Sequence, residues 1–309
     1  MLRIALFLAT NLAVMLVLGV LLAVLSAAGV IPPEYSRSYG PLLVMCGMFG
    51  FTGSLISLFL SKTIAKRSVG ARVIEQPRGA EEAWLVQTVA RLAEEAGIGM
   101  PEVAVYDSPD INAFATGARR NDALVAVSTG LLRRVDRQGV EGVLGHEVAH
   151  VANGDMVTLT LLQGVLNTFV LFFARVIGMA IDNAMRRGGN NNRASFYYRG
   201  PGYYLGVMLA ELVLGVIATV IAMWFSRWRE YRADAGGARL AGTYPMLHAL
   251  EQLADSARAD REGLPESLAA FGIRPSKGGM LAKLFSTHPP LDERIRRLRA
   301  RAQSEGIEV

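Results

Sequence analysis

Two histidines and a glutamate lie within one short stretch of the chain, which reads His146-Glu147-Val148-Ala149-His150. On an α-helix, residues four positions apart project from the same face, one turn above the other, so the two imidazoles can bind one cation. Neutral imidazole nitrogens suit Zn²⁺, which in hydrolases takes three protein ligands and keeps a fourth position for water. Glu147, next to the first histidine, is then placed to accept a proton from that water.

The residues around this stretch favour a functional role. The chain has four histidines, and two of them fall here. A spacing of this kind also arises by chance, and the alternative is a pair of structural histidines with no ligand role. The apolar residues of the segment follow a helical period, which predicts an amphipathic helix that sets the histidines against a core; they are Val140, Val143, Leu144, Val148 and Val151.

A third ligand must come from elsewhere in the chain, and Glu230 is the candidate. Asp234 follows it by four residues, so both carboxylates lie on one face of a helix. One helix can therefore deliver Glu230 to the metal and Asp234 to a hydrogen bond with a ligand histidine.

These motifs occur together with a third, Ser286-Thr287-His288-Pro289-Pro290. In this order they resemble the HtpX-type membrane zinc metalloproteases of bacteria, which are related to the CAAX-prenyl protease family. The likeness extends over nearly the whole chain, including the positions of the apolar segments. It implies a gluzincin-like zinc endopeptidase with one Zn²⁺ per chain, which cleaves misfolded or damaged membrane proteins under stress.

The resemblance also implies roles for three further residues. By analogy with related zinc proteases, His288 hydrogen-bonds the oxyanion of the tetrahedral intermediate and Arg294 assists it. Asn112 is expected to contact the substrate backbone. The alternatives are a structural histidine that closes a loop, an arginine on a solvated helix, and an asparagine that satisfies its own backbone in a turn.

Two uncharged segments near the N-terminus predict membrane spans. Hydrophobic residues make up 51% of the 309 residues, and the mean hydropathy is +0.30. Within residues 1–62, the segments 4–31 and 38–61 carry no charge, and each exceeds the roughly 20 residues that cross a bilayer. A cleaved signal peptide is the alternative for the first segment, but its apolar run is longer than the ~7–15 residues of the apolar region in a signal peptide.

A second apolar region, residues 156–226, separates the zinc motif from Glu230. It predicts a hairpin of two membrane helices, at about 156–181 and 203–226. Arg175 and Glu211 interrupt the apolar runs, and their positions along the two helices allow them to meet near the far interface and pair, or to snorkel there. The alternative is a hairpin that covers the site without crossing the bilayer fully.

The remaining residues, 63–155 and 227–309, are expected to form one zinc protease domain. An amphipathic helix is predicted over 81–96, and strands over 102–106 and 123–127. The expected fold class is therefore an integral membrane protein, mainly α, with a small β-sheet. A sheet edge near Asn112 or residues 123–128 is the candidate surface for an extended substrate.

Charge predicts the side of the membrane and the partners. Four basic residues follow the second span, at Lys62, Lys66, Arg67 and Arg72, and by the positive-inside rule the protease domain faces the cytoplasm. The chain has a net charge of +5, and its basic residues cluster beside apolar segments, so anionic lipid is expected as a partner and nucleic acid is not. The resemblance implies the bacterial inner membrane, with membrane-protein substrates and other membrane quality-control proteases as partners.

Two other functions fit parts of the pattern. An intramembrane zinc protease would carry the histidines inside an apolar span, but five charged residues precede them between 133 and 141. A non-enzymatic scaffold or chaperone, stabilised by zinc, would use four closed ligands and would not need Glu147.

Overall fold

The computed structural model describes residues 33–187, 200–262 and 288–307, together with the single positions 16, 20 and 24. Apart from those three positions, the expected first span, residues 4–31, lies outside the described residues. Ser286 and Thr287 also lie outside them, whereas His288 lies inside. The chain divides into two compact units: residues 1–57 with 160–222, and residues 58–159 with 223–309. Each unit is assembled from two separate stretches of chain.

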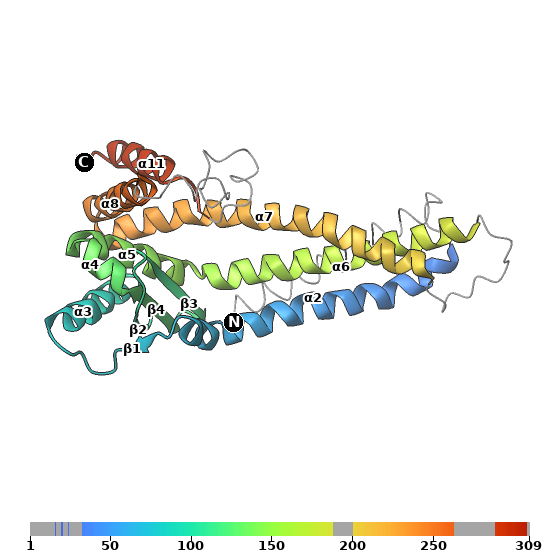
Figure 1. Ribbon diagram of the computed structural model, residues 1–309, viewed down its shortest axis with the longest axis horizontal. Coiled ribbons are helices and arrows are strands. Elements are labelled where there is room, and N and C mark those ends of the chain that lie inside the picture. The colour runs from blue at the N-terminus through green and yellow to red at the C-terminus, as the bar shows by residue number, and fades with distance from the viewer. Residues whose placement is uncertain are drawn as a thin grey trace. The chain divides into compact units, whose positions relative to one another are not determined.

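The first unit contains parts of three long apolar helices: α2 (Pro33–Ser68), α6 (Asp155–Arg187) and α7 (Pro201–Ala241) (Figure 1). Among the described residues, three segments are long and apolar enough to cross a membrane. They are Gly40–Ser68, Asp155–Met185 and Pro201–Ala241, with mean hydropathies of 2.0, 1.9 and 2.4. This length and hydropathy indicate a membrane-embedded part of the protein.

A close contact at a glycine and an ion pair connect these helices. A Cβ atom at Gly50 on α2 would lie 2.6 Å from Thr168 Oγ1 on α6, so the two helices approach this closely only because the residue is glycine. Arg175 Nη1 lies 3.5 Å from Glu211 Oε1. The predicted pairing of these two interrupting charges is therefore confirmed.

The second unit contains a four-stranded sheet of order β1-β2-β4-β3. Its strands are β1 (Arg72–Val73), β2 (Glu102–Tyr106), β3 (Ala113–Arg119) and β4 (Asp122–Ser128). β2 and β4 are parallel, and the other two pairings are antiparallel. Because β4 is internal, six of its seven residues are buried. The expectation that residues 123–128 form a sheet edge is wrong, whereas β3, which follows Asn112, is an edge strand.

Three helices contact the sheet: α3 (Ala80–Glu95), α4 (Thr129–Arg134) and α5 (Arg137–Asn153). Two others lie outside them, α8 (Thr243–Glu262) against α5 and α11 (Leu291–Ser304) against α8. The predicted apolar face of α3 is buried, with Leu85, Val89 and Leu92 all 0% exposed. Leu144 and Val148 of α5 pack into the same core. The expected fold class, mainly α with a small sheet and apolar membrane helices, is confirmed.

Glycine also sets the distance between α5 and α7. A Cβ atom at Gly237 on α7 would lie 2.9 Å from the backbone nitrogen of His146, and one at Gly145 on α5 would lie 2.8 Å from Ala241 Cβ. Such contacts are too short for any side chain, so the two backbones touch here. This close approach brings the carboxylates of α7 to the histidines of α5.

Candidate metal centre and active site

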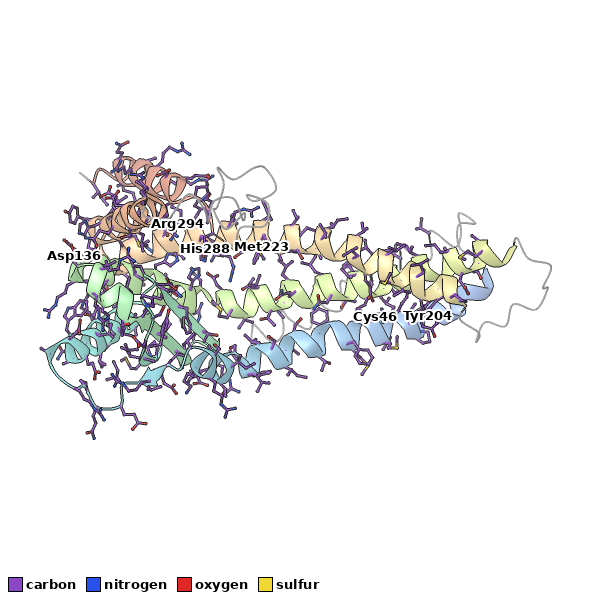
Figure 2. All side chains as sticks on the ribbon, in the orientation of Figure 1. Cys46, Asp136, Tyr204, Met223, His288 and Arg294 are labelled. Carbon is purple, nitrogen blue, oxygen red and sulfur yellow. The ribbon has the colours of Figure 1, made fainter. Side chains whose placement is uncertain are left out.

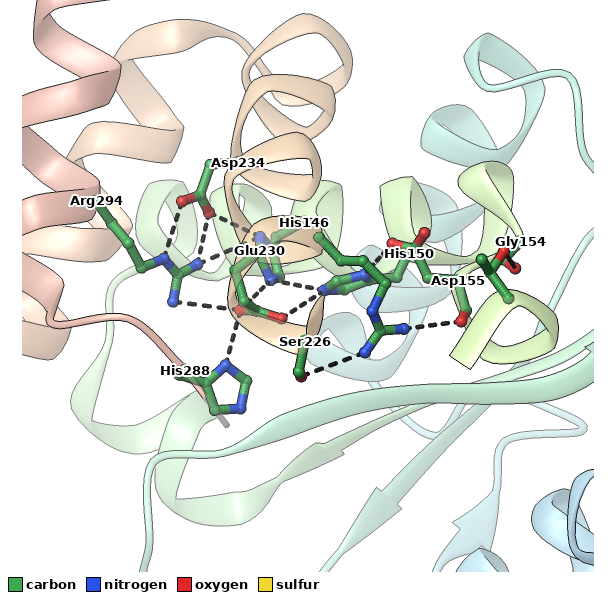
Figure 3. Close-up of polar contacts among 11 residues, drawn as sticks. His146, His150, Gly154, Asp155, Ser226, Glu230, Asp234, His288 and Arg294 are labelled. Carbon is green, nitrogen blue, oxygen red and sulfur yellow. Dashed lines mark hydrogen bonds and ion pairs between the residues drawn. The ribbon is translucent and has the colours of Figure 1, made fainter. Parts of the chain in front are cut away.

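Helix α5 presents His146 and His150 from one face. Asp136 caps its N-terminus, accepting a hydrogen bond from Gly139 N at 2.8 Å, and Gly154 ends it with a left-handed φ of 69°. The two rings are 7% and 6% exposed, and their Nε2 atoms lie 3.1 Å apart (Figure 3). The predicted helical spacing therefore corresponds to two buried imidazoles whose Nε2 atoms lie side by side.

Glu230 completes a triangle of donor atoms. Its Oε1 lies 3.2 Å from His150 Nε2, and its Oε2 lies 3.5 Å from His146 Nε2. Ligand bonds of about 2.0–2.1 Å around a tetrahedral metal ion place the ligand atoms about 3.3 Å apart. The donor distances of 3.1, 3.2 and 3.5 Å match this value, so the three residues fit a tetrahedral metal ion with its fourth position left open.

A carboxylate contacts the other nitrogen of each ring. Asp234 Oδ1 lies 3.0 Å from His146 Nδ1, and Asp155 Oδ2 lies 2.7 Å from His150 Nδ1. Each Nδ1–H can donate to its carboxylate, which leaves the Nε2 lone pair directed toward Glu230. A carboxylate beside each Nδ1 therefore favours, in the neutral ring, the tautomer that leaves Nε2 able to bind a metal.

Asp234 occupies the position that the sequence predicted for it, but the contact of Asp155 was not predicted. On an unbroken helix a residue five positions after His150 points about 140° away from it. The left-handed turn at Gly154 starts a new helix, α6, and returns Asp155 to the histidine. The signal in the sequence was an acidic residue, Asp155, directly after a glycine. This signal indicates a contact with His150 only once helix α5 is known to end at Gly154.

The carboxylates attract positive charge to the two rings. Burial disfavours the charged form of His150, but hydrogen bonds to Asp155 and Glu230 outweigh burial and raise its pKa to about 10. Burial likewise opposes the charged form of His146, and its contacts with Asp234 and Glu230 raise its pKa. A cation between the Nε2 atoms satisfies the same carboxylates, so the electrostatics also fit a metal ion.

Glu147 is half-buried on α5, directly after His146. Its negative charge contributes to the raised pKa values of His150 and of Arg294, which places its carboxylate in the same electrostatic environment as the donor triangle. Its role as the general base stays a prediction.

His288 and Arg294 approach the site from the C-terminal part of the chain (Figure 2). His288 Nδ1 lies 2.7 Å from Glu230 Oε2, although the histidine side chain is 63% exposed. Arg294 is buried and donates two hydrogen bonds to Asp234, from Nε at 2.9 Å and from Nη2 at 2.6 Å. Burial opposes its charge, but Asp234 keeps the pKa of this guanidinium above its usual value. Arg294 thus fixes the residue that orients His146, and its expected assistance to the oxyanion stays a prediction.

Asn112 lies where the edge strand β3 begins. Its backbone pairs with Ser128 at the end of β4: Asn112 N donates to Ser128 Oγ at 3.1 Å, and Asn112 O accepts from Ser128 N at 2.9 Å. β3 packs against α5, the helix of the two histidines. Among the described residues, the strand next to Asn112 is therefore the edge strand of the sheet on the side of α5, and the contact of Asn112 with substrate stays a prediction.

Fold and site together define a membrane metallopeptidase, with two histidines and a glutamate that could hold a metal ion and long apolar helices as the membrane part. The model of peptidase family M48 matches residues 79–302, and the chain belongs to this family.

Two relatives that match over nearly their full length are both proteases named HtpX. Protease HtpX of Alkalilimnicola ehrlichii is 55% identical over 301 residues, which cover 96% of this chain and 97% of the relative. Protease HtpX of Xanthomonas euvesicatoria pv. vesicatoria is 58% identical over 305 residues, or 98% of each chain. The crystal structure of S. mikatae Ste24p has a TM-score of 0.58 and 18% identity, and the match covers 94% of this chain and 66% of that one. The last comparison supports the fold, and the first two confirm the predicted membrane protease activity.

Proposed function

We propose that this protein is a zinc-dependent endopeptidase that cleaves misfolded or damaged membrane proteins at the cytoplasmic surface of the inner membrane. The observation that carries the proposal is the donor triangle of His146, His150 and Glu230, in which the three donor atoms lie within 4.8 Å of one another. Two imidazoles and one carboxylate with an open fourth position are the ligand set of catalytic zinc in many hydrolases.

The proposed mechanism divides the work among the residues around the triangle. When zinc is bound there, it polarises the scissile carbonyl and makes water more acidic. Glu147 accepts the proton of the attacking water and later passes it to the leaving amine. His288 stabilises the oxyanion. Asp234, which Arg294 holds in place, keeps His146 in the metal-binding tautomer.

Substrate is proposed to bind as an extended chain along β3. An edge strand offers backbone hydrogen bonds without demanding a particular side-chain sequence, which suits an enzyme that removes damaged proteins of many kinds. Asn112, at the start of β3, is proposed to contact the substrate backbone. In this account the protease domain consists of residues 63–155 and 227–309.

The location at the membrane surface is supported by the side chains of α7 just before Glu230. Trp224 and Trp228 are 62% and 45% exposed, and the Arg232 guanidinium lies 5.0 Å from the ring centre of Trp228. Tryptophan together with arginine is typical of the boundary between apolar lipid and water. At 1.5 Å per residue, Glu230 lies only about 3–9 Å along the helix from the two tryptophans.

The cytoplasmic orientation is proposed from the basic residues that follow Ser61, by the positive-inside rule. Cooperation with other membrane quality-control proteases is proposed from the same cellular role. The candidate spans among the described residues do not include α5, so the histidines lie outside those segments. This observation opposes an intramembrane protease.

A proteolysis assay tests the proposal. The full-length protein is reconstituted in lipid with a destabilised membrane protein as substrate, with and without a zinc chelator. Glu147→Gln should retain zinc and lose about 100-fold or more of the activity, because a positioned general base contributes on that scale. Glu141→Gln is the matched control, since Glu141 lies on the same helix and pairs with Arg91 at the surface.

Full activity of Glu147→Gln, or of the wild type stripped of metal, would refute the enzyme mechanism. A protein that binds zinc and protects the substrate without cleaving it would instead be the non-enzymatic scaffold or chaperone.

A further inference from the structure

Asp155 lies at the junction of two helices. It is the first residue of α6 and directly follows Gly154, where α5 ends. Its side chain is almost fully buried, and its Oδ2 lies 2.7 Å from His150 Nδ1 (Figure 3). A buried carboxylate is costly unless it is hydrogen-bonded, and the described partner of this one is a histidine of the donor triangle.

Arg229 fixes the backbone of Asp155. Its Nη1 donates to the carbonyl oxygen of Asp155 at 2.8 Å, and its Nη2 donates to Ser226 Oγ at 3.4 Å. Arg229 is 5% exposed. Because Arg229 immediately precedes Glu230 on α7, the same turn of helix supplies one donor of the triangle and holds the residue that contacts another.

We propose that Asp155 is a positioning residue for His150 and that Arg229 holds Asp155 in place, so that a metal-binding ring is fixed by the first residue of the apolar helix α6. The proposal rests on the metal-binding role proposed above for His150. Asp155 acts through the histidine: it accepts the Nδ1–H hydrogen bond, selects the tautomer and sets the direction of Nε2.

The arrangement pairs each histidine with an apolar helix. Asp234 orients His146 from α7, and Asp155 orients His150 from α6. Both helices contain segments long and apolar enough to cross a membrane. Metal affinity should therefore depend on how α6 begins, even though α6 supplies none of the three proposed ligands.

Zinc affinity of the full-length protein in lipid nanodiscs tests this inference, measured by competition with a chelating dye. Asp155→Leu removes the acceptor and should lower the affinity about 10- to 100-fold, the range seen when such supporting contacts are lost. Asp155→Asn keeps a carbonyl oxygen that can accept from Nδ1–H, so its loss should be smaller. Asp255→Asn, at a carboxylate that is 76% exposed, is the matched control and should bind zinc as the wild type does.

Two further readouts separate positioning from a merely structural role. The visible spectrum of the Co²⁺-substituted protein reports ligand geometry, and it should change in Asp155→Asn but not in Asp255→Asn. Arg229→Met should also weaken zinc binding in the wild-type background. Its effect should largely disappear in the Asp155→Leu background, because both changes act through one hydrogen bond to His150.

The outcomes are distinct. A lower melting temperature of Asp155→Leu and Asp155→Asn with unchanged zinc affinity and an unchanged Co²⁺ spectrum would overturn the inference and leave the proposed function intact. Full additivity of the Asp155→Leu and Arg229→Met effects would overturn the part assigned to Arg229. A wild-type protein that binds no zinc would instead overturn the proposed function, and this inference with it.

Discussion

The contact between α5 and α7 predicts that a single methyl group, added at a residue that is not itself a proposed ligand, weakens metal binding. In Gly237→Ala the new Cβ would lie 2.9 Å from His146 N, whereas ordinary van der Waals contact begins at 3.4 Å. The two backbones must therefore separate by about 0.5 Å, which exceeds the roughly 0.2 Å tolerance of metal–ligand distances. Glu230 lies on one of these helices, and both histidines lie on the other.

The size of the effect follows from the cost of overpacking. Adding a methyl group to a close-packed contact costs about 1–3 kcal/mol. If that cost falls on the metal-bound form, zinc affinity drops about 5- to 140-fold, at about 1.4 kcal/mol for each factor of ten. Gly215→Ala is the control in the same helix, because nothing lies within 4 Å of its new Cβ.

Dye competition for zinc, followed by proteolysis at saturating zinc, measures both variants against the wild type. Gly237→Ala should bind zinc more weakly, and Gly215→Ala should not differ from the wild type. Equal zinc affinity for Gly237→Ala and the wild type would refute the argument that backbone contact sets the donor distances.

Two further predictions concern the rest of the structure. Asp136→Ala should lower the free energy of unfolding by about 1 kcal/mol through loss of the helix cap. The Gly139 N–H and His248 hold the pKa of Asp136 below its usual value. This contribution to the free energy of unfolding is therefore present at neutral pH and is lost as the pH falls through the lowered pKa. A difference in unfolding free energy between wild type and Asp136→Ala that stays constant into acid would contradict this prediction. Trp224 and Trp228 should be quenched by brominated lipid, measured after the third tryptophan is replaced by phenylalanine; quenching by aqueous acrylamide alone would contradict their proposed place at the lipid boundary.

Much of the site could be predicted from sequence because its geometry is local. His146 and His150 are related by one turn of a single helix, and the apolar period of α5 predicts the face that is buried. Glu230 and Asp234 are likewise one turn apart, so each helix carries a pair of polar residues whose relative positions follow from helical geometry alone. The apolar helices could also be predicted locally, because each corresponds to one long, mostly uncharged segment of the sequence.

The remainder depends on contacts that spacing does not encode. The strands 102–106 and 123–127 were predicted, but their order in the sheet depends on tertiary packing. β4 is therefore an internal strand, although the sequence had allowed residues 123–128 to form a sheet edge. Asp155 reaches His150 only because Gly154 redirects the chain. Arg294 reads as one charge among several on an amphipathic helix, and its burial against Asp234 follows from how α11 packs.

Anomalous diffraction at the zinc absorption edge, from crystals of the full-length protein grown with zinc, would locate the metal ion. We expect one strong peak about 2.0–2.2 Å from His146 Nε2, His150 Nε2 and a carboxylate oxygen of Glu230, with the fourth position open to water. A peak elsewhere in the molecule, or zinc closed off by four protein ligands that do not include Glu230, would contradict it.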